Sequence, residues 1–392
     1  MLRNFLVLIL LVGCIPLLAL GQDDTIASTG GLNIGFHNYG ICFGNSSVHN
    51  GLRFNWSDDG IERINGINFT LWKPGDNPTG TVNGLSIGIL APTAEELNGV
   101  NIGGLAVVAG NGMNGVSFGS LAAVSLGSAT GIKFGGLGLV AKDDITGINV
   151  GGLACVSGGD IMGISLSSMA LVGKKSITGL NFGGLALVSE GTITGLNFGG
   201  IAAVGKDGIM GINISSVALV AEGPIDGFNL GGVAVVGKEH LGGVNIAAAA
   251  LVSEGLVYGV NVSGLAVVGA EGIKGITFGG AGIVSKGEIS GVNVTVGDLR
   301  SDESIAGLNF GGYRIRAREI KGINLGIVMT EAKYSTGLMT GIYNRATGTQ
   351  KGISIGIFNH ATELFGIQLG ILNWAENNPE YLRLLPLINV HL

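Results

Sequence analysis

The chain has 392 residues, of which 74 are glycine and 7 are proline. Glycine is far more frequent than its ordinary share of about 7 %, but it does not recur in Gly-X-Y triplets, which excludes collagen. Charged residues make up 12 % and hydrophobic residues 46 %, too apolar a balance for a disordered chain. The net charge of −6 gives no basic footprint for nucleic acid.

Residues 1–21 have the layout of a secretory signal peptide. One cation, Arg3, precedes an apolar run from Phe5 to Leu20, and small residues stand before a cleavage point after Gly21. The run is short for a spanning helix. A bacterial lipoprotein box ending at Cys14 is the alternative, but apolar residues follow Cys14, which is unusual for a lipid-anchored tether. We expect export and cleavage after Gly21.

A 16-residue repeat fills the centre of the chain. Glycine recurs every 16 residues from Gly99 to Gly307, and we number the positions of each repeat from this glycine as rows 1 to 16. Rows 2, 4, 7 and 9 are apolar, row 3 is mostly asparagine, rows 5 and 6 are mostly glycine, and row 8 is alanine or glycine. Row 10 is valine twelve times running, from Val108 to Val284. Looser copies precede the array from Gly51 onward. After the array the repeat shortens to 15 and then 14 residues, with the last copy beginning at Gly366.

This pattern predicts an all-β chain with one elongated β-solenoid. Alternating apolar rows are typical of strands rather than helices, and we expect corners at the row-1 glycine, at rows 5 and 6, and at rows 11–14. Constant repeat length favours coils that stack at about 4.8 Å, so about twenty coils would form a rod near 100 Å long. The predicted organisation is a signal peptide (1–21), an N-terminal cap (22–50), the repeat array (51–376, regular over 99–306) and a C-terminal cap (377–392).

The rows also predict how neighbouring coils interact. Rows 2, 4, 7 and 9 are the expected core, which would leave rows 3, 5, 6 and 8 as a flat outer face of small residues. Asparagines stacked in row 3 would form an amide ladder. Row 12 alternates lysine and glutamate from Lys174 to Glu254, which would attract neighbouring coils weakly.

A membrane β-barrel is the alternative architecture. Twelve residues, from row 15 of one repeat to row 10 of the next, would suffice for a tilted spanning strand. Such a barrel requires a polar lumen and usually long loops on one side. The repeats instead have an apolar alternation and turns of four residues, so the solenoid is favoured.

No catalytic, cofactor-binding or metal-ligating residues are assigned. Three acidic pairs (Asp58-Asp59, Glu95-Glu96 and Asp143-Asp144) could serve a solenoid glycosidase, but we interpret them as solvated turn residues. Cys155 occupies apolar row 9 and is expected to be a buried hydrophobe rather than a disulfide partner of Cys42. The sequence carries none of the common nucleophile-elbow, zincin or P-loop motifs, and its five histidines do not have metal-site spacing: His37, His49, His240, His360 and His391.

Several copies of the repeat resemble a known family. Asn50–Asn55, Gly66–Phe69, Gly352–Asn359 and Gly366–Asn373 are similar to the surface-repeat proteins of bacterial envelopes, first recognised in spirochaetes. The resemblance implies an exported, surface-associated protein of a Gram-negative-type cell with no assigned activity. We therefore expect a non-enzymatic structural or adhesive scaffold at the cell surface, in the outer membrane or outside the cell. Its expected partners are an envelope component, a glycan or further copies of itself. An outer-membrane barrel and a polysaccharide-active solenoid enzyme are the alternatives.

Overall fold

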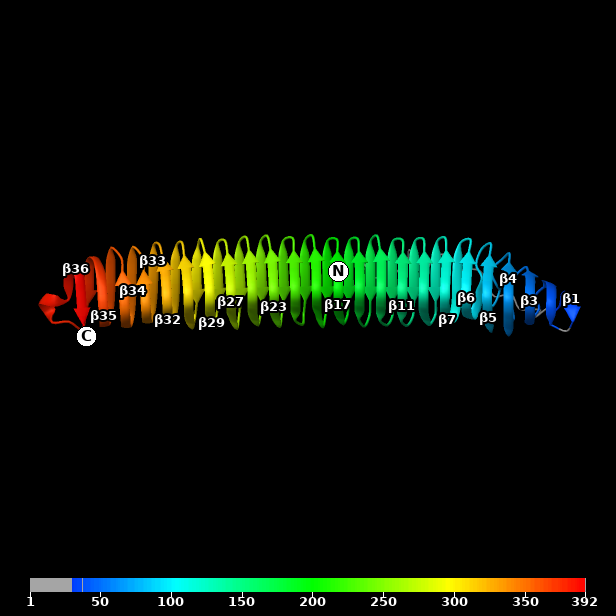
Figure 1. Cartoon of the computed structure of the whole chain (residues 1–392), viewed down its shortest axis with the longest axis horizontal. Coiled ribbons are helices and arrows are strands. Elements are labelled where there is room, and N and C mark those ends of the chain that lie inside the picture. The colour runs from blue at the N-terminus through cyan, green and yellow to red at the C-terminus, as the bar shows by residue number, and fades with distance from the viewer. Residues whose placement is uncertain (1–29, 37, 392) are drawn as a thin grey trace. The chain divides into compact units, whose positions relative to one another are not determined.

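The computed structural model describes residues 30–36 and 38–391. The predicted signal peptide, Cys14 and His37 lie outside the described residues. The chain divides into an N-terminal unit that ends at Gly183 and a C-terminal unit that begins at Gly184. Strands dominate both units, and Figure 1 shows them side by side in successive coils within each unit.

The strands of the N-terminal unit lengthen and shorten in alternation once the regular repeats begin. They are β1 (Gly31–Phe36), β2 (Tyr39–Gly44), β3 (Val48–Asn55), β4 (Arg63–Thr70), β5 (Thr81–Gly88), β6 (Thr93–Gly103), β7 (Ala106–Gly119), β8 (Ala122–Ser125), β9 (Ser128–Gly135), β10 (Gly138–Ala141), β11 (Ile145–Gly151), β12 (Ala154–Ser157), β13 (Ile161–Ser167), β14 (Ala170–Gly173) and β15 (Ile177–Gly183).

The C-terminal unit continues the alternation and ends in longer strands and one 3-10 turn. Its elements are β16 (Ala186–Ser189), β17 (Thr192–Gly199), β18 (Ala202–Gly205), β19 (Gly208–Ser215), β20 (Ala218–Ala221), β21 (Ile225–Gly231), β22 (Ala234–Gly237), β23 (His240–Ala247), β24 (Ala250–Ser253), β25 (Leu256–Ser263), β26 (Ala266–Gly269), β27 (Gly272–Gly279), β28 (Gly282–Ser285), β29 (Glu288–Thr295), β30 (Asp298–Ser301), β31 (Ser304–Gly311), β32 (Arg314–Gly326), β33 (Met329–Thr340), β34 (Tyr343–Ile355), β35 (Phe358–Ala375), η1 (Glu380–Leu382) and β36 (Leu384–His391).

Each regular coil consists of one long strand, one short strand and two tight turns. In the C-terminal unit, long β17 pairs in parallel with long β19, so that Gly195 lies opposite Gly211. Short β18 pairs in parallel with short β20. The partners differ by one 16-residue repeat, which confirms the predicted β-solenoid. Parallel pairing between strands one repeat apart differs from the antiparallel pairing of the membrane β-barrel that was the alternative prediction.

The row-1 glycine lies inside the long strand, so the corner predicted there is wrong. Gly211 has a φ of +107°, in the region that favours glycine. A Cβ atom on this residue would collide with the carbonyl oxygen of Gly195 in the preceding coil. The glycine is therefore needed for close backbone approach within the strand, and the chain turns only after row 5 and after row 11.

Most of the apolar rows that were predicted to form the core point outward instead. In the coil that begins at Gly179, Asn181 in row 3, Leu187 in row 9 and Ile193 in row 15 are each 0 % exposed. Leu180 in row 2 and Phe182 in row 4 are exposed. The interior thus contains rows 3, 5, 9, 11 and 15, and of the four predicted core rows only row 9 is buried.

The predicted asparagine ladder is confirmed, but it lies inside the solenoid and not on the outer face predicted for row 3. In the C-terminal unit, the Nδ2 atoms of Asn197, Asn213, Asn229 and Asn245 each donate to the Oδ1 atom one coil further on, over 2.8–2.9 Å. Their side chains are fully buried, so the ladder satisfies polar groups that would otherwise be costly inside the solenoid. Row 3 is therefore both the hydrogen-bonded centre of the coil and part of its core.

Antiparallel strands occur at the two ends of the described chain. β1 pairs antiparallel with β2 in the N-terminal unit, and β36 pairs antiparallel with β35 in the C-terminal unit. β1, β2 and β36 lie within the segments predicted as caps, whereas β35 lies within the predicted repeat array. The coils before β36 also differ from the regular repeat, because β32, β33 and β34 run continuously through the position of the polar turn.

Candidate interaction surface

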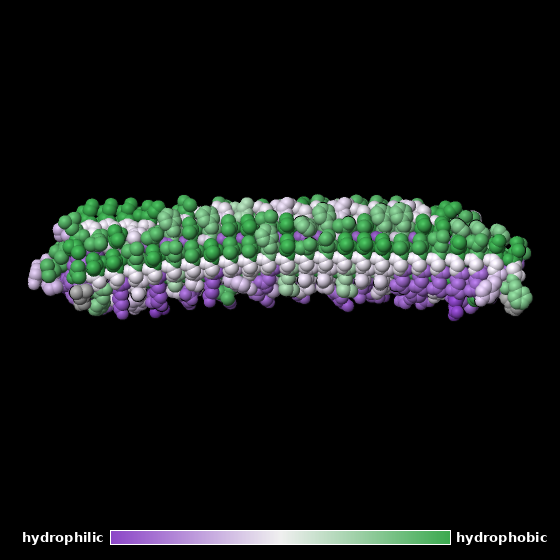
Figure 2. All heavy atoms as spheres, in the orientation of Figure 1, coloured by the Kyte–Doolittle hydropathy of each residue, from purple (hydrophilic) through white to green (hydrophobic). Residues whose placement is uncertain are grey.

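The apolar rows that point outward form an apolar surface along the coils. We define the apolar band as the outward side chains of rows 2, 4 and 7. Rows 2 and 4 point away from the interior because they alternate with buried rows 3 and 5 on the long strand. Row 7 lies at the turn between the long and the short strand, which joins the two sheet faces. Figure 2 shows rows of green, hydrophobic side chains along the coils and purple, hydrophilic side chains along the lower edge of the view.

The band residues are half-buried or exposed, and many of them are at least a third exposed. In the C-terminal unit, Leu196 is 40 % exposed, Ile201 50 % and Leu265 57 %. In the N-terminal unit, the rings of Phe118 and Phe134 in row 4 stack at 4.8 Å with an interplanar angle of 5°. Side chains of one coil thus pack on those of the next, while their outer surfaces stay open to solvent.

The extent of the band exceeds that of an ordinary protein surface. Over the seven regular coils that begin at Gly195 to Gly291, rows 2, 4 and 7 expose on the order of 1,500 Å² of apolar surface, since a large apolar side chain carries roughly 150–250 Å². The largest apolar patch of a soluble monomer is usually about 300–600 Å². A patch of this size is typical of a surface that is covered by a partner.

The opposite edge of each coil is polar. It holds row 12, where Nζ of Lys238 lies 3.1 Å from a carboxylate oxygen of Glu222 in the preceding coil. Both side chains are more than half exposed, so this pair adds little stability. In the C-terminal unit the regular coils are consequently amphipathic in cross-section, with the apolar band on one edge and charged turns on the other.

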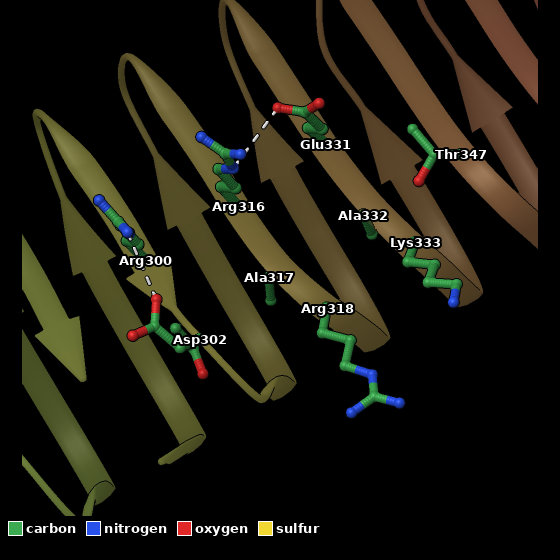
Figure 3. A pocket seen from close by; sticks show the side chains of 10 residues that line it. Arg300, Asp302, Arg316, Ala317, Arg318, Glu331, Ala332, Lys333 and Thr347 are labelled. Atoms are coloured by element: carbon green, nitrogen blue, oxygen red, sulfur yellow. Dashed lines mark hydrogen bonds and ion pairs between the residues drawn. The ribbon is translucent and has the colours of Figure 1, made fainter. Parts of the chain in front are cut away.

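Charged side chains replace the row-10 valine in the last regular coil and in the shortened coils that follow it. Arg300 lies opposite Arg316, Arg316 opposite Glu331, and Glu331 opposite Arg345 along the paired short-strand positions. A carboxylate oxygen of Glu331 lies 3.6 Å from Nε of Arg316, and the other lies 3.5 Å from a guanidinium nitrogen of Arg345. Figure 3 shows the hollow bordered by this row and by Arg318 and Lys333.

Asp58 is not a solvated turn residue, and that prediction is wrong. Asp58 is 1 % exposed and lies 2.9 Å from the guanidinium of Arg53, which is fully buried. It also accepts hydrogen bonds from the side chains of Asn55 and Asn68 and from the backbone N–H of Thr93. Burial lowers the pKa of Arg53, while the Asp58 carboxylate counteracts that shift. This network ties three early coils together.

The other acidic pairs lie at the surface in separate coils. Glu95 and Asp143 are exposed. Glu96 accepts a hydrogen bond from the side chain of Asn111, and Asp144 from the backbone N–H of Asp160. Glu96 and Asp144 therefore link successive coils, and neither forms a carboxylate pair with a residue of another acidic pair.

The histidines have separate structural surroundings. His49 is buried and its Nε2 atom is 3.0 Å from the carbonyl oxygen of Gly40. His240 pairs with Asp226 and His360 with Glu376, both at 3.0 Å, and His391 contacts the side chain of Asn378. Among the residues that the structure describes, no group of three or more His, Cys, Asp or Glu side chains could hold a metal ion.

The two cysteines of the described chain are free and buried. Cys155 is 0 % exposed in row 9, as predicted, and burial raises the pKa of its thiol to about 12. Asn213, Asn261 and Asn293, which fit the glycosylation consensus, are also fully buried in the interior ladder. No helix within the described residues has the length and hydropathy to cross a bilayer.

Lys133 is a buried titratable residue that was not predicted from the sequence. It replaces asparagine in row 3 and is fully buried, with Nζ donating to the carbonyl oxygens of Gly115 and Thr130, each at 2.7 Å. Burial lowers the pKa of this lysine to about 8. Its position in the asparagine row was the available signal, but that row was predicted to face outward.

Comparison with known proteins gives no relative. No family model, no curated protein and no solved structure matches the chain.

Proposed function

We propose that the protein is an exported, surface-associated scaffold that works by lateral association of its solenoid rather than by catalysis. The observation that carries this proposal is the apolar band, which recurs in rows 2 and 4 of every regular coil in the C-terminal unit and in row 7 of most of them. Burial of apolar surface is the dominant driving force of association. The sequence of residues 1–21 and the envelope-repeat resemblance support export.

A second copy of the chain is the partner that fits the band best. Its side chains recur at the spacing of successive coils, about 4.8 Å. Two bands have the same period, so one contact between them is repeated at every coil. Matching rows of side chains can then interdigitate as in the dry interfaces between stacked sheets. The area on one unit also exceeds the roughly 800 Å² that each partner contributes to a standard interface.

Disulfide trapping tests this association in the mature protein. Ile212→Cys introduces a thiol in row 2 of the band, and Lys206→Cys introduces one in exposed row 12 of the polar edge. The native cysteines of the described residues, Cys42 and Cys155, are buried. We expect mild oxidation to give a disulfide-linked dimer with Ile212→Cys and little with Lys206→Cys. Equal cross-linking of both variants would contradict association through the band.

Export is tested separately on the natural precursor. We expect mass spectrometry of the mature protein to give an N-terminus at Gln22, and protease added to intact cells to digest it. A lipid-modified N-terminus at Cys14 would retain export but replace the cleavage that we propose. Retention of residues 1–21 inside the cell would contradict export.

A further inference from the structure

The charged hollow in the shortened coils occurs where three departures from the repeat coincide. The repeat length falls from 16 to 15 residues after Gly307. The polar turn disappears, because β32 and β33 run on through that position. The row-10 valine is replaced by Arg300 in the last 16-residue coil and by Arg316 and Glu331 in the first two shortened coils.

The loss of the turn creates the hollow. Its volume is about 340 Å³. Small buried side chains in row 11, Ser301, Ala317 and Ala332, form its floor. One wall is the row-10 set of charged side chains, and the other is formed by the row-12 side chains of the same coils (Figure 3).

The hollow carries a net positive charge on an acidic protein. Four cations, Arg300, Arg316, Arg318 and Lys333, line it together with two carboxylates, Asp302 and Glu331. The chain as a whole has a net charge of −6. Cations grouped in this way create a local positive potential that attracts anions despite the overall charge.

The row-10 cations are held in place by carboxylates. Arg300 lies 3.4 Å from Asp302, and Arg316 lies 3.6 Å from Glu331. Arg345, in the next coil, lies 3.5 Å from the same Glu331. The two carboxylates therefore orient guanidinium groups that still have several donors available, since each guanidinium has five N–H donors.

The row-12 cations are available to a ligand. In the part of the chain that the structure describes, no ion pair joins Arg318 or Lys333 to a carboxylate. Both side chains are exposed, and Lys333 extends over the ring of Tyr334 at 5.2 Å from the ring centroid. Guanidinium and ammonium groups of this kind form charge-assisted hydrogen bonds to carboxylate, sulfate or phosphate oxygens.

We propose that this hollow binds an extended polyanion, specifically an acidic polysaccharide whose anionic groups recur along its length. The cations come from three successive coils, so they follow the stacking direction over a span of about 10 Å at about 4.8 Å per coil. A chain with several anionic groups can contact them together, whereas one small oxyanion reaches a single coil or two. The residues lining the hollow include no aromatic ring on which a nucleobase could stack.

Titration calorimetry on the full mature chain at low and moderate salt tests this site. The probes are a heparin-derived sulfated oligosaccharide, an oligogalacturonate, neutral dextran and inorganic pyrophosphate. We expect the two acidic oligosaccharides to bind with an affinity that falls as salt increases, and dextran not to bind. Pyrophosphate that binds as tightly as the oligosaccharides would overturn the extended polyanion in favour of a small-anion site.

Matched charge-removal variants locate the binding. Arg318→Gln combined with Lys333→Gln is expected to weaken oligosaccharide binding about tenfold or more. The control is Lys206→Gln combined with Lys286→Gln, which removes two exposed row-12 lysines from regular coils and the same amount of charge. Equal losses in both double variants would overturn the proposal. Because all four side chains are exposed, circular dichroism should show unchanged folding, and lateral association through the band is not affected by either pair.

Discussion

Tyr258 donates a hydrogen bond to Asp226 from two coils away. The Oη atom of Tyr258 lies 3.0 Å from Oδ1 of Asp226, and the intervening row-16 residue is Gly242. A Cβ atom on Gly242 would collide with both side chains. His240 completes the cluster, since its Nε2 atom lies 3.0 Å from the other Asp226 oxygen. The missing side chain of Gly242 is thus what allows the contact.

A double-mutant cycle measures this bond. We expect Tyr258→Phe and Asp226→Ala to show a coupling of about 0.5–1 kcal/mol in denaturant unfolding, the usual range for a hydrogen bond at a partly exposed site. In a Gly242→Ala background the coupling should vanish, because the methyl group occupies the space between the partners. Coupling that survives in that background would contradict the bridge.

The row-1 glycines are predicted to be indispensable. Gly131 has a φ of +113°, and a Cβ atom there would strike the carbonyl oxygen of Gly115. Gly131→Ala should therefore destabilise the protein by several kcal/mol, because both strain and backbone overlap arise. Gly138, seven residues further on in row 8, has only an ordinary contact at 3.8 Å, so Gly138→Ala should be neutral or stabilise by up to about 1 kcal/mol. Thermal unfolding compares the two, and similar effects would contradict the account.

The interior and exterior amide ladders should differ in strength. Asn229→Ala removes one buried step and leaves the amide of Asn213 and the oxygen of Asn245 unpaired, at a cost of about 2–5 kcal/mol. A second ladder, formed by asparagines that directly precede the leading glycines in the N-terminal unit, provides the control, since Asn98 donates to Asn83 and accepts from Asn114 where water has access. We expect Asn98→Ala to cost less than about 1 kcal/mol in denaturant unfolding. Equal costs would show that burial of the row-3 ladder is unimportant.

Lys133 should make stability depend on pH. Its pKa falls from 10.5 to about 8 on folding, so between these values the unfolded chain holds the proton and the folded chain does not. Stability therefore rises as pH increases from about 8 to 10.5, by on the order of 3 kcal/mol, and is constant with respect to this group below pH 8. Lys133→Asn restores the row-3 residue, and we expect it to be more stable at pH 7 and to lose this rise. An unchanged pH profile in Lys133→Asn would contradict the assignment.

Much of the fold is predictable from the sequence because a solenoid repeats its constraints. The period of the row-1 glycine predicts the parallel register, and the row-3 asparagines predict the amide ladder that joins Asn213 to Asn229. Alternation alone, however, defines two faces without saying which is inside. Ile193 in row 15 would have shown which face is inside. It lies four residues before Asn197 on the same continuous strand, so the two side chains are on the same face, and both point inward.

The sites were less predictable than the fold, for physical reasons that particular residues illustrate. Asp58 is buried because Arg53, one strand earlier, compensates its charge, and no local pattern indicates that pairing. The hollow near Arg318 depends on deletion of one residue from the turn, whose structural effect is visible only when β32 is seen to run through it. The apolar band was not predicted, because apolar rows are generally expected to face the core.

Sedimentation velocity of the mature protein without detergent tests the central claim, that the apolar band associates with a second copy. The informative variant replaces three row-2 residues of successive coils by serine (Leu196→Ser, Ile212→Ser and Phe228→Ser). Its control replaces the row-12 residues of the same coils by serine (Lys206→Ser, Glu222→Ser and Lys238→Ser). We predict concentration-dependent association for the natural protein and the control, and a marked loss of association for the row-2 variant. A natural protein that stays monomeric over the whole concentration range, or a row-2 variant that associates as strongly as the control, would contradict the account.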